Sequence, residues 1–160
     1  MFRIGNGYDV HRLVKERKLV LGGVEIPHVA GLDGHSDADA LLHAICDAVL
    51  GACGAGDLGR HFPDSDPKWK NVSSLLLLKK VGDICRQRRF QIVNTDAIVV
   101  AQKPRLAPFI DQMKTNIAAA LDIPADQVNV KATTTETLGF VGREEGIAAY
   151  AVAMLRENND

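Results

Sequence analysis

Cysteine is scarce in this sequence, and its few copies are not spaced for a disulfide framework. Cys46, Cys53 and Cys85 are the only cysteines in 160 residues, and no C-x-x-C pair occurs. Disulfide frameworks use even sets of cysteines, so an odd, scattered set argues against one. Two of the three fall in apolar, helical context. We therefore expect the cysteines to be small buried hydrophobic residues.

The chain also lacks an excess of positive charge and a long hydrophobic run. Its net charge is -1 and no basic stripe is present, which argues against a nucleic-acid partner. No apolar run approaches the ~20 residues that cross a bilayer, and the start, MFRIGNGYDV, lacks the regions of a signal peptide. We expect a complete cytoplasmic protein without a membrane partner. If its ligand is a polyanion, cations other than side chains must help to hold it.

The remaining composition is that of an ordinary globular protein, with 46% hydrophobic and 24% charged residues. We expect a single domain over residues 1–160, with room for a real core. Strands and helices alternate, which predicts an α/β (α+β layer) fold: a mixed β-sheet with helices on one face. The expected strands are residues 2–8, 91–101, 128–132 and 147–155, and a hairpin is expected at 19–26. The expected helices are 39–53, 73–88 (capped by Ser73 or Ser74) and 108–122. A long loop is expected over 54–67.

The last predicted strand, AYAVAM, carries small or apolar side chains on both of its faces. If helices cover one face of the sheet, the other face needs a partner, which favours an oligomer built sheet to sheet. A sheet buried on both sides within the monomer fits the composition equally well.

The stretch GNGYDVH places an acid and an imidazole two residues apart, at what reads as a strand end. Residues i and i+2 of a strand point the same way, so Asp9 and His11 project together. Alone, this pair fits a polar strand end, and His43 alone fits a satisfied core histidine. Together, Asp9, His11 and His43 match a catalytic zinc site, with three protein ligands and one open position. Asp39 or Asp47, four residues to either side of His43, can orient its other nitrogen.

Two further clusters contain groups that bind phosphate. His35, Ser36 and Asp39 stand where the first long helix begins, so they can cap it or, with the free N–H groups there, hold phosphate oxygens. The run from Lys131 to Glu136, KATTTE, places three hydroxyls and a carboxylate after a strand. That run suits phosphate and a hard divalent cation such as Mg²⁺, although a Thr-rich turn is an equal reading.

Four motifs recur in the same order in one family: GYDVH, GLDGHSDADALLHAICDAVLGA, GDLGRHFPDSDP and NVKATTTETLGFVGREEGIAAYAVA. From residue 2 to about 155, the chain resembles the 2-C-methyl-D-erythritol 2,4-cyclodiphosphate synthase family. The resemblance implies a small α/β subunit in a homotrimer, with the sheets facing the threefold axis and the active sites between subunits. The family often has Gly at Ala38 and Lys at Arg105 and Thr137. Arg105 keeps the positive charge but has a planar guanidinium, Thr137 lacks the charge, and none of the three is a metal ligand.

The resemblance also implies roles for individual residues. The Zn²⁺ ligands are Asp9, His11 and His43; Glu136 holds a second divalent cation, Mg²⁺ or Mn²⁺, on the substrate diphosphate; and His35 and Thr134 stabilise the transition state. The pocket for the methylerythritol phosphate end comprises His35, Ser36, Asp57, Leu58, Gly59, Phe62, Pro63, Asp64, Ser65 and Asp66. The cytidine pocket comprises Ala101, Gln102, Lys103, Pro104, Arg105, Leu106, Ala107, Thr133 and Thr134, and further substrate contacts are Val10, Thr135, Phe140 and Arg143.

The implied reaction is an intramolecular phosphoryl transfer. In 4-diphosphocytidyl-2-C-methyl-D-erythritol 2-phosphate, the 2-phosphate attacks the β-phosphorus, CMP leaves, and a cyclic diphosphate forms. Two alternatives remain: a zinc-dependent phosphoester hydrolase, and a non-catalytic trimeric module that binds a nucleotide or an isoprenoid diphosphate. In the family, the counterparts of Arg143 and Glu145 lie around an axial cavity able to hold an isoprenoid diphosphate; an inter-subunit salt bridge is an equal reading of this pair.

Overall fold

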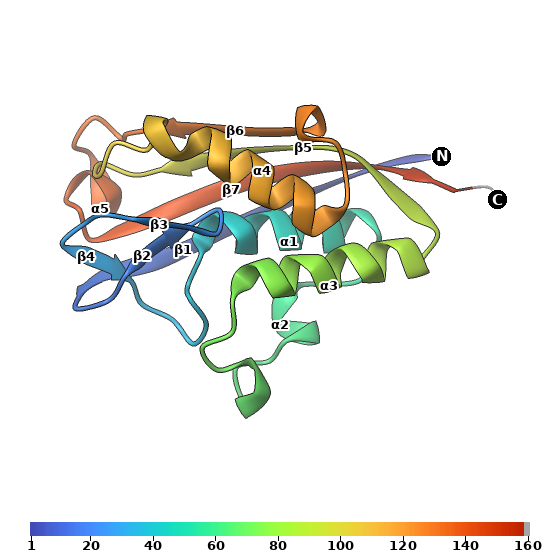
Figure 1. Cartoon of the computed structure of the whole chain (residues 1–160), viewed down its shortest axis with the longest axis horizontal. Coiled ribbons are helices and arrows are strands. Elements are labelled where there is room, and N and C mark those ends of the chain that lie inside the picture. Colours follow the sequence, from blue (N-terminus) through green and yellow to red (C-terminus); the bar gives the residue numbers. More distant parts are fainter. Residues whose placement is uncertain (159–160) are drawn as a thin grey trace.

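The computed structural model describes residues 1–158, and its centre is a mixed five-stranded sheet (Figure 1). The strand order is β4-β1-β7-β5-β6, in which β5 and β6 are parallel and the other neighbours antiparallel. A separate hairpin joins β2 and β3. The strands are β1 (Phe2–Lys15), β2 (Leu19–Leu21), β3 (Val24–Ile26), β4 (Ala30–Leu32), β5 (Phe90–Val100), β6 (Val128–Thr133) and β7 (Gly146–Glu157).

Three long helices cover one face of this sheet, as predicted: α1 (Ala40–Ala52), α3 (Ser74–Gln87) and α4 (Ile110–Leu121) (Figure 1). Local chemistry sets their ends, since Asp39 caps α1, Ser73 caps α3, and Asp122 ends α4 in a left-handed conformation. Within residues 1–158, no helix is long and apolar enough to cross a membrane. The short helices are α2 (Leu58–His61) and α5 (Gly139–Gly142), with 3-10 turns η1 (Pro67–Trp69), η2 (Ala107–Phe109) and η3 (Ala125–Gln127).

Helix α1 lies directly on β1 because two residues of that strand have no side chain. A Cβ atom at Gly5 would lie 2.1 Å from the carbonyl oxygen of Ala48, and one at Gly7 would lie 1.9 Å from that of Ala44. Any larger residue would push the helix away from the strand. This close approach brings the next inward-facing residues of β1, Asp9 and His11, within reach of α1.

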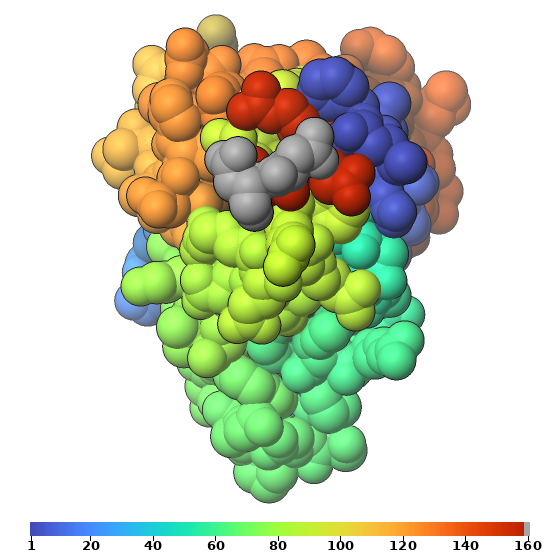
Figure 2. Space-filling model, turned by 90° about the vertical axis from the view of Figure 1, so that its right-hand side faces the viewer, coloured from blue at the N-terminus to red at the C-terminus, as the bar shows by residue number. Residues whose placement is uncertain are grey.

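The predicted elements are all present, but some bounds differ. Strand β1 continues to Lys15, so the expectation that Asp9 and His11 stand at a strand end is wrong. Its last three residues, Leu13 to Lys15, pair with β4, which the sequence did not reveal. The predicted loop over 54–67 contains α2, and this part of the chain projects away from the sheet (Figures 1 and 2). All three cysteines are buried and unpaired, as expected.

No described residue covers the second face of the sheet. Large side chains of β1 and β7 are exposed there: Tyr8 by 45%, Tyr150 by 51% and Val152 by 47%. Tyr8 and Tyr150 stand opposite each other in the ladder, with ring centroids 4.7 Å apart. The alternative of a sheet buried on both sides within the monomer is therefore wrong.

Candidate metal centre

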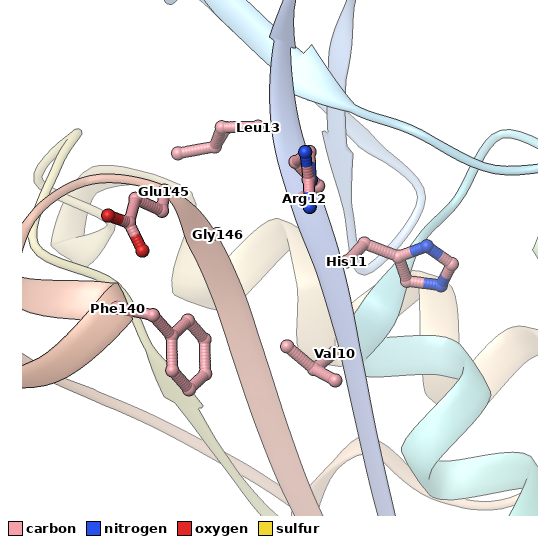
Figure 3. Close-up of a pocket in the computed structure, with 7 residues that line it drawn as sticks. All are labelled: Val10, His11, Arg12, Leu13, Phe140, Glu145 and Gly146. Atoms are coloured by element: carbon pink, nitrogen blue, oxygen red, sulfur yellow. The ribbon is translucent and has the colours of Figure 1, made fainter.

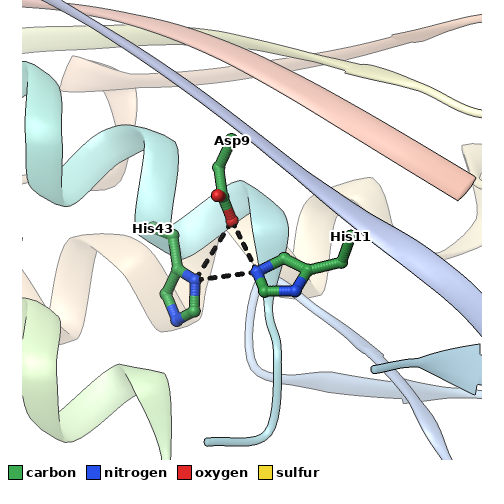
Figure 4. Close-up of side chains that lie close together, drawn as sticks. All are labelled: Asp9, His11 and His43. Carbon is green, nitrogen blue, oxygen red and sulfur yellow. Dashed lines mark hydrogen bonds and ion pairs between the residues drawn. The ribbon is translucent and has the colours of Figure 1, made fainter. Parts of the chain in front are cut away.

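Asp9, His11 and His43 converge on one point, although His43 is 32 residues from His11 in the chain (Figure 4). The first two project from the inward face of β1, and His43 projects from α1 toward them. Oδ2 of Asp9 lies 2.8 Å from Nε2 of His11 and 3.1 Å from Nδ1 of His43. The two ring nitrogens are 3.3 Å apart. The sequence-based prediction that these three side chains meet is confirmed.

The opposite nitrogen of each imidazole also has a partner. Nδ1 of His11 lies 2.7 Å from the carbonyl oxygen of Asp33, which accepts a hydrogen bond from it. Nε2 of His43 lies 2.9 Å from Oγ of Ser74. These contacts leave Nε2 of His11 and Nδ1 of His43 as the atoms that face the common point.

Neither acid proposed to orient His43 does so. Asp39 is fully buried and accepts N–H bonds from Leu42 at 3.0 Å and from the β2–β3 turn, Gly22 at 3.0 Å and Gly23 at 2.8 Å. Asp47 accepts the N–H of Leu58 at 2.7 Å. Both carboxylates are therefore engaged by backbone donors: Asp39 by the first turn of α1 and the β2–β3 turn, and Asp47, within α1, by the first residue of α2.

The electrostatics of the three groups favour a cation between them. Burial alone would raise the pKa of Asp9, but hydrogen bonds from His11 and His43 outweigh it and hold that pKa below its usual value. Burial alone would lower the pKa of His11, but its hydrogen bond to Asp9 and the negative charge there raise it. One carboxylate oxygen and two imidazole nitrogens at these distances therefore stabilise a positive charge that lies between them.

A cavity of about 300 Å³ opens beside the three groups. It brings together several residues of the predicted methylerythritol phosphate pocket: His35, Ser36, Leu58, Gly59, Phe62 and Asp64 line it with Asp9, His11 and His43. The Nε2 atom of His35 is buried and has no hydrogen-bond partner within the described residues. Such an atom is costly to leave unpaired, so it marks a place for a polar ligand.

Other predicted residues of this pocket have structural contacts instead. Asp57 caps α2 by accepting the N–H of Arg60, and Asp66 caps η1 and pairs with Lys68 at 2.8 Å. Pro63 and Ser65 lie between them and do not line the cavity.

The predicted cytidine pocket lies elsewhere in the sheet. The ends of β5 and β6 adjoin, with the N–H of Ala101 donating to the carbonyl oxygen of Thr133 at 2.9 Å, so the segment 101–107 begins beside the turn 133–136. Oε1 of Gln102 accepts the N–H of Thr137 at 3.2 Å, and the hydroxyl of Thr134 donates to the carboxylate of Glu136 at 3.2 Å. Both clusters that the sequence indicated are thus assembled, each from segments distant in the chain.

Within one chain the two clusters are not adjacent. Asp9 pairs with Ala149 of β7, which pairs with Val99 of β5, which pairs with Ala132 of β6. Three strand spacings of ~4.8 Å separate the ends of this row by about 14 Å. A single chain therefore does not present one continuous site.

A third group of residues lines a separate cavity of about 640 Å³ (Figure 3). Phe140 and Glu145 line it from the region of α5, and Val10 to Leu13 line it from β1. The guanidinium of Arg143 pairs with Glu145 of the same chain, with Nε 2.9 Å from Oε1. The pair expected as a possible link between subunits is therefore already formed within one.

Sequence reasoning gave three residues no role in supporting the metal ligands or the cavity. Ser74 and Asp37 extend the contacts of His43, and Arg17 donates to the carbonyl oxygens of Gly34 at 3.1 Å and Ser36 at 2.9 Å. Arg17 therefore holds the loop that carries His35 and Ser36. Two adjacent serines before a helix signal a cap, which Ser73 provides, and no sequence feature distinguishes the role of Ser74.

Known proteins resemble this chain in both sequence and structure. The model of the YgbB family matches residues 2–156. A relative from Syntrophomonas wolfei, named 2-C-methyl-D-erythritol 2,4-cyclodiphosphate synthase, is 61% identical over 155 residues, which are 97% of this chain and 99% of the relative.

Solved structures agree with the sequence relatives. The chain resembles the structure described as IspF from Plasmodium falciparum in a CDP complex, with 34% identity, a TM-score of 0.86 and coverage of 99% of this chain and 97% of that one. It also resembles the bifunctional IspDF of Campylobacter jejuni, with 46% identity and a TM-score of 0.94 over 98% of this chain. The chain spans 42% of that longer protein.

Proposed function

The chain belongs to the YgbB family, and we propose that it catalyses the cyclodiphosphate synthase reaction. The substrate is 4-diphosphocytidyl-2-C-methyl-D-erythritol 2-phosphate, and the products are 2-C-methyl-D-erythritol 2,4-cyclodiphosphate and CMP. The reaction belongs to non-mevalonate isoprenoid biosynthesis. Residues 1–160 form its single domain, and the enzyme works in the cytoplasm.

The convergence of Asp9, His11 and His43 carries this proposal. Ligand atoms ~2.0–2.2 Å from a tetrahedral zinc ion stand about 3.3–3.6 Å from one another. The three ligand atoms lie 2.8 to 3.3 Å apart, so a small outward movement fits them to such an ion. One carboxylate and two imidazoles form a donor set suited to Zn²⁺, and we propose Zn²⁺ as the metal.

The reaction must overcome repulsion between phosphate groups. Two like unit charges ~4 Å apart repel by about 4 kcal/mol at an effective dielectric constant of 20. The net charge of the chain is -1, so its side chains alone do not offset several such terms. Bound Zn²⁺ and a second divalent cation, Mg²⁺ or Mn²⁺, supply charge neutralisation and orientation for the phosphate oxygens.

The chain's own residues bind and orient the substrate. Asp9, His11 and His43 hold the first cation, and the carboxylate of Glu136 holds the second. His35, through its unpaired Nε2, and Ser36 receive the methylerythritol phosphate end in the 300 Å³ cavity. The segment 101–107, Thr133 and Thr134 receive the cytidine end, and folding the substrate between these places contributes ~7–11 kcal/mol as an intramolecular reaction.

A homotrimer completes the site under this proposal. The two clusters are about 14 Å apart along the sheet of one chain, which is too far for one diphosphate to touch both. The uncovered sheet face carries Tyr8, Tyr150 and Val152, which suit contact with further copies. Sheet-to-sheet packing would leave the metal cluster of one subunit free to meet the cytidine cluster of the next.

Product analysis tests the proposal. Purified protein with Zn²⁺ and Mg²⁺ is incubated with the substrate in ¹⁸O-labelled water, and phosphorus NMR and mass spectrometry follow the products. We expect one CMP per turnover and a cyclic diphosphate without solvent oxygen. An open-chain product with solvent ¹⁸O would favour the phosphoester hydrolase, and binding without CMP release would favour the non-catalytic module.

A further inference from the structure

Two buried polar side chains continue the contacts of His43 away from the cavity. Nε2 of His43 lies 2.9 Å from Oγ of Ser74, a residue that is fully buried at the start of α3. The hydroxyl of Ser74 donates to one carboxylate oxygen of Asp37, and the other oxygen accepts the backbone N–H of Ser74 at 2.9 Å. Asp37 belongs to the loop before α1, so this line of contacts joins three segments.

The number of protons along this line determines which nitrogen of His43 carries the ring proton. A serine hydroxyl has one proton, and that of Ser74 goes to Asp37. The oxygen of Ser74 is then only an acceptor toward His43, so Nε2 of the neutral imidazole must carry the ring proton. Nδ1, 3.1 Å from Oδ2 of Asp9, then carries a proton to donate to that carboxylate only when the ring is cationic; in the neutral ring its lone pair is available to a cation.

A second hydroxyl near this nitrogen does not change the result. Oγ of Ser36 also accepts the N–H of Ala38 at 3.1 Å, and it lies 3.3 Å from Nε2 of His43, so it is a weaker partner of this nitrogen than Ser74 at 2.9 Å. Ser36 also lines the cavity, where it faces the substrate, whereas Ser74 and Asp37 do not line the cavity. The Ser74–Asp37 pair therefore has no contact with substrate and acts through His43 alone.

We propose that Ser74 and Asp37 are positioning residues that hold His43 in its Nε2-protonated form, with Nδ1 directed at the metal. The proposal rests on the metal site argued above. Hydrogen bonds to the outer nitrogen of a ligating histidine fix its tautomer and ring orientation, and their loss typically lowers metal affinity 10–100-fold. Here the hydroxyl of Ser74 connects the carboxylate of Asp37 to the imidazole of His43.

Zinc affinity of the purified full-length chain tests this, measured by competition with a chromophoric chelator. We expect Ser74→Ala and Asp37→Ala to bind Zn²⁺ roughly 10–100-fold more weakly than the unsubstituted protein. Ser73→Ala is the matched control, because the hydroxyl of Ser73 accepts the N–H of Leu75 to cap α3 and has no contact with His43. It should leave zinc affinity unchanged, and circular dichroism monitors folding of every variant.

Nitrogen NMR of metal-free, unsubstituted protein provides a readout that does not depend on variants folding. At a pH where His43 is neutral, its single ring proton should be on Nε2, and a neutral ring with that proton on Nδ1 would overturn the proposal. Unaltered zinc binding by folded Ser74→Ala would also overturn it. His43→Ala separates the two levels: if it loses zinc while Ser74→Ala keeps it, only the positioning role fails, and if it keeps zinc, the metal site itself is wrong.

Discussion

Nε2 of His11 lies 3.3 Å from Nδ1 of His43, one ring on a strand and the other on a helix. Two unprotonated nitrogens at this distance repel unless a cation lies between them, and Asp9 supplies the negative charge that attracts one. The contact exists because Gly5 and Gly7 let α1 lie against β1. Packing of the core and chemistry of the site are therefore consequences of the same sequence, GNGYDVH.

Removal of one of these rings should abolish turnover. His43→Ala leaves two ligands, and the loss of several kcal/mol of charge stabilisation corresponds to a fall in CMP formation of at least about a thousandfold. Removal of the metal from the unsubstituted protein by a chelator should lower CMP formation as strongly. Added Zn²⁺ should restore the activity of the unsubstituted protein but not that of His43→Ala. His28→Ala, in the loop between β3 and β4, is the control and should keep its activity. Full turnover of zinc-free His43→Ala would refute the catalytic role of the centre.

The close approach of α1 and β1 predicts opposite effects for two glycine substitutions. Gly7→Ala would place a methyl group 1.9 Å from the carbonyl oxygen of Ala44, so it should lower the free energy of unfolding by about 3 kcal/mol or more. Gly51→Ala, on the exposed side of α1, meets nothing nearer than 3.9 Å and should raise it by roughly 0.5–1 kcal/mol through helix propensity. Urea denaturation measures both, and equal effects would contradict the packing.

Much of this arrangement could be predicted from the sequence, because periodicity and caps are local signals. Alternation put Asp9 and His11 on one face, and the apolar spacing around His43 predicted the helix that carries it. The end of β1 was misjudged because its second half is polar and is held by the backbone of β4 and β7. That support comes from residues 15 positions away (Lys15 with Ala30) to 140 positions away (Asp9 with Ala149), which no local pattern records.

The support behind the ligands was hidden for the same reason. The bond between Ser74 and Asp37 spans 37 residues, and both residue types, next to a helix start, look like caps. Asp39 was given a role toward His43 on helical spacing alone, whereas its carboxylate turns back to the β2–β3 turn. Spacing on a helix defines a shared face but not the direction of a short side chain that has nearer donors.

Asp39 predicts a pH dependence of stability. Burial raises the pKa of this carboxyl from 3.8 to about 6, against its backbone hydrogen bonds. Between these values the unfolded chain has lost the proton that the folded chain keeps, so raising the pH destabilises the fold. Protonation of Asp39 contributes about 3 kcal/mol to the free energy of unfolding. This contribution is fully present below about pH 4 and is lost as the pH rises through about 6.

Asp39→Asn provides the reference for this effect, since it cannot titrate and retains an oxygen that can accept the N–H of Leu42. We expect the free energy of unfolding of the unsubstituted protein, minus that of Asp39→Asn, to fall between pH 4 and pH 6.5. Urea denaturation of both metal-free proteins across this range measures the difference, in which other titrating groups cancel. A difference that is flat or increases with pH would show that the backbone donors outweigh burial.

The uncovered sheet face predicts that assembly and catalysis fail together. Val152→Asp places a charge on the face where Val152, 47% exposed, would meet another subunit, so it should convert a trimer to monomers. In the proposed trimer one chain would hold only half of each site, so CMP formation should fall by at least about a hundredfold while the fold and zinc binding at Asp9, His11 and His43 persist. Val29→Asp, at an 86% exposed position away from this face, is the control and should change neither property. Light scattering gives the mass of each variant, and an active Val152→Asp monomer would show that a single chain completes the site.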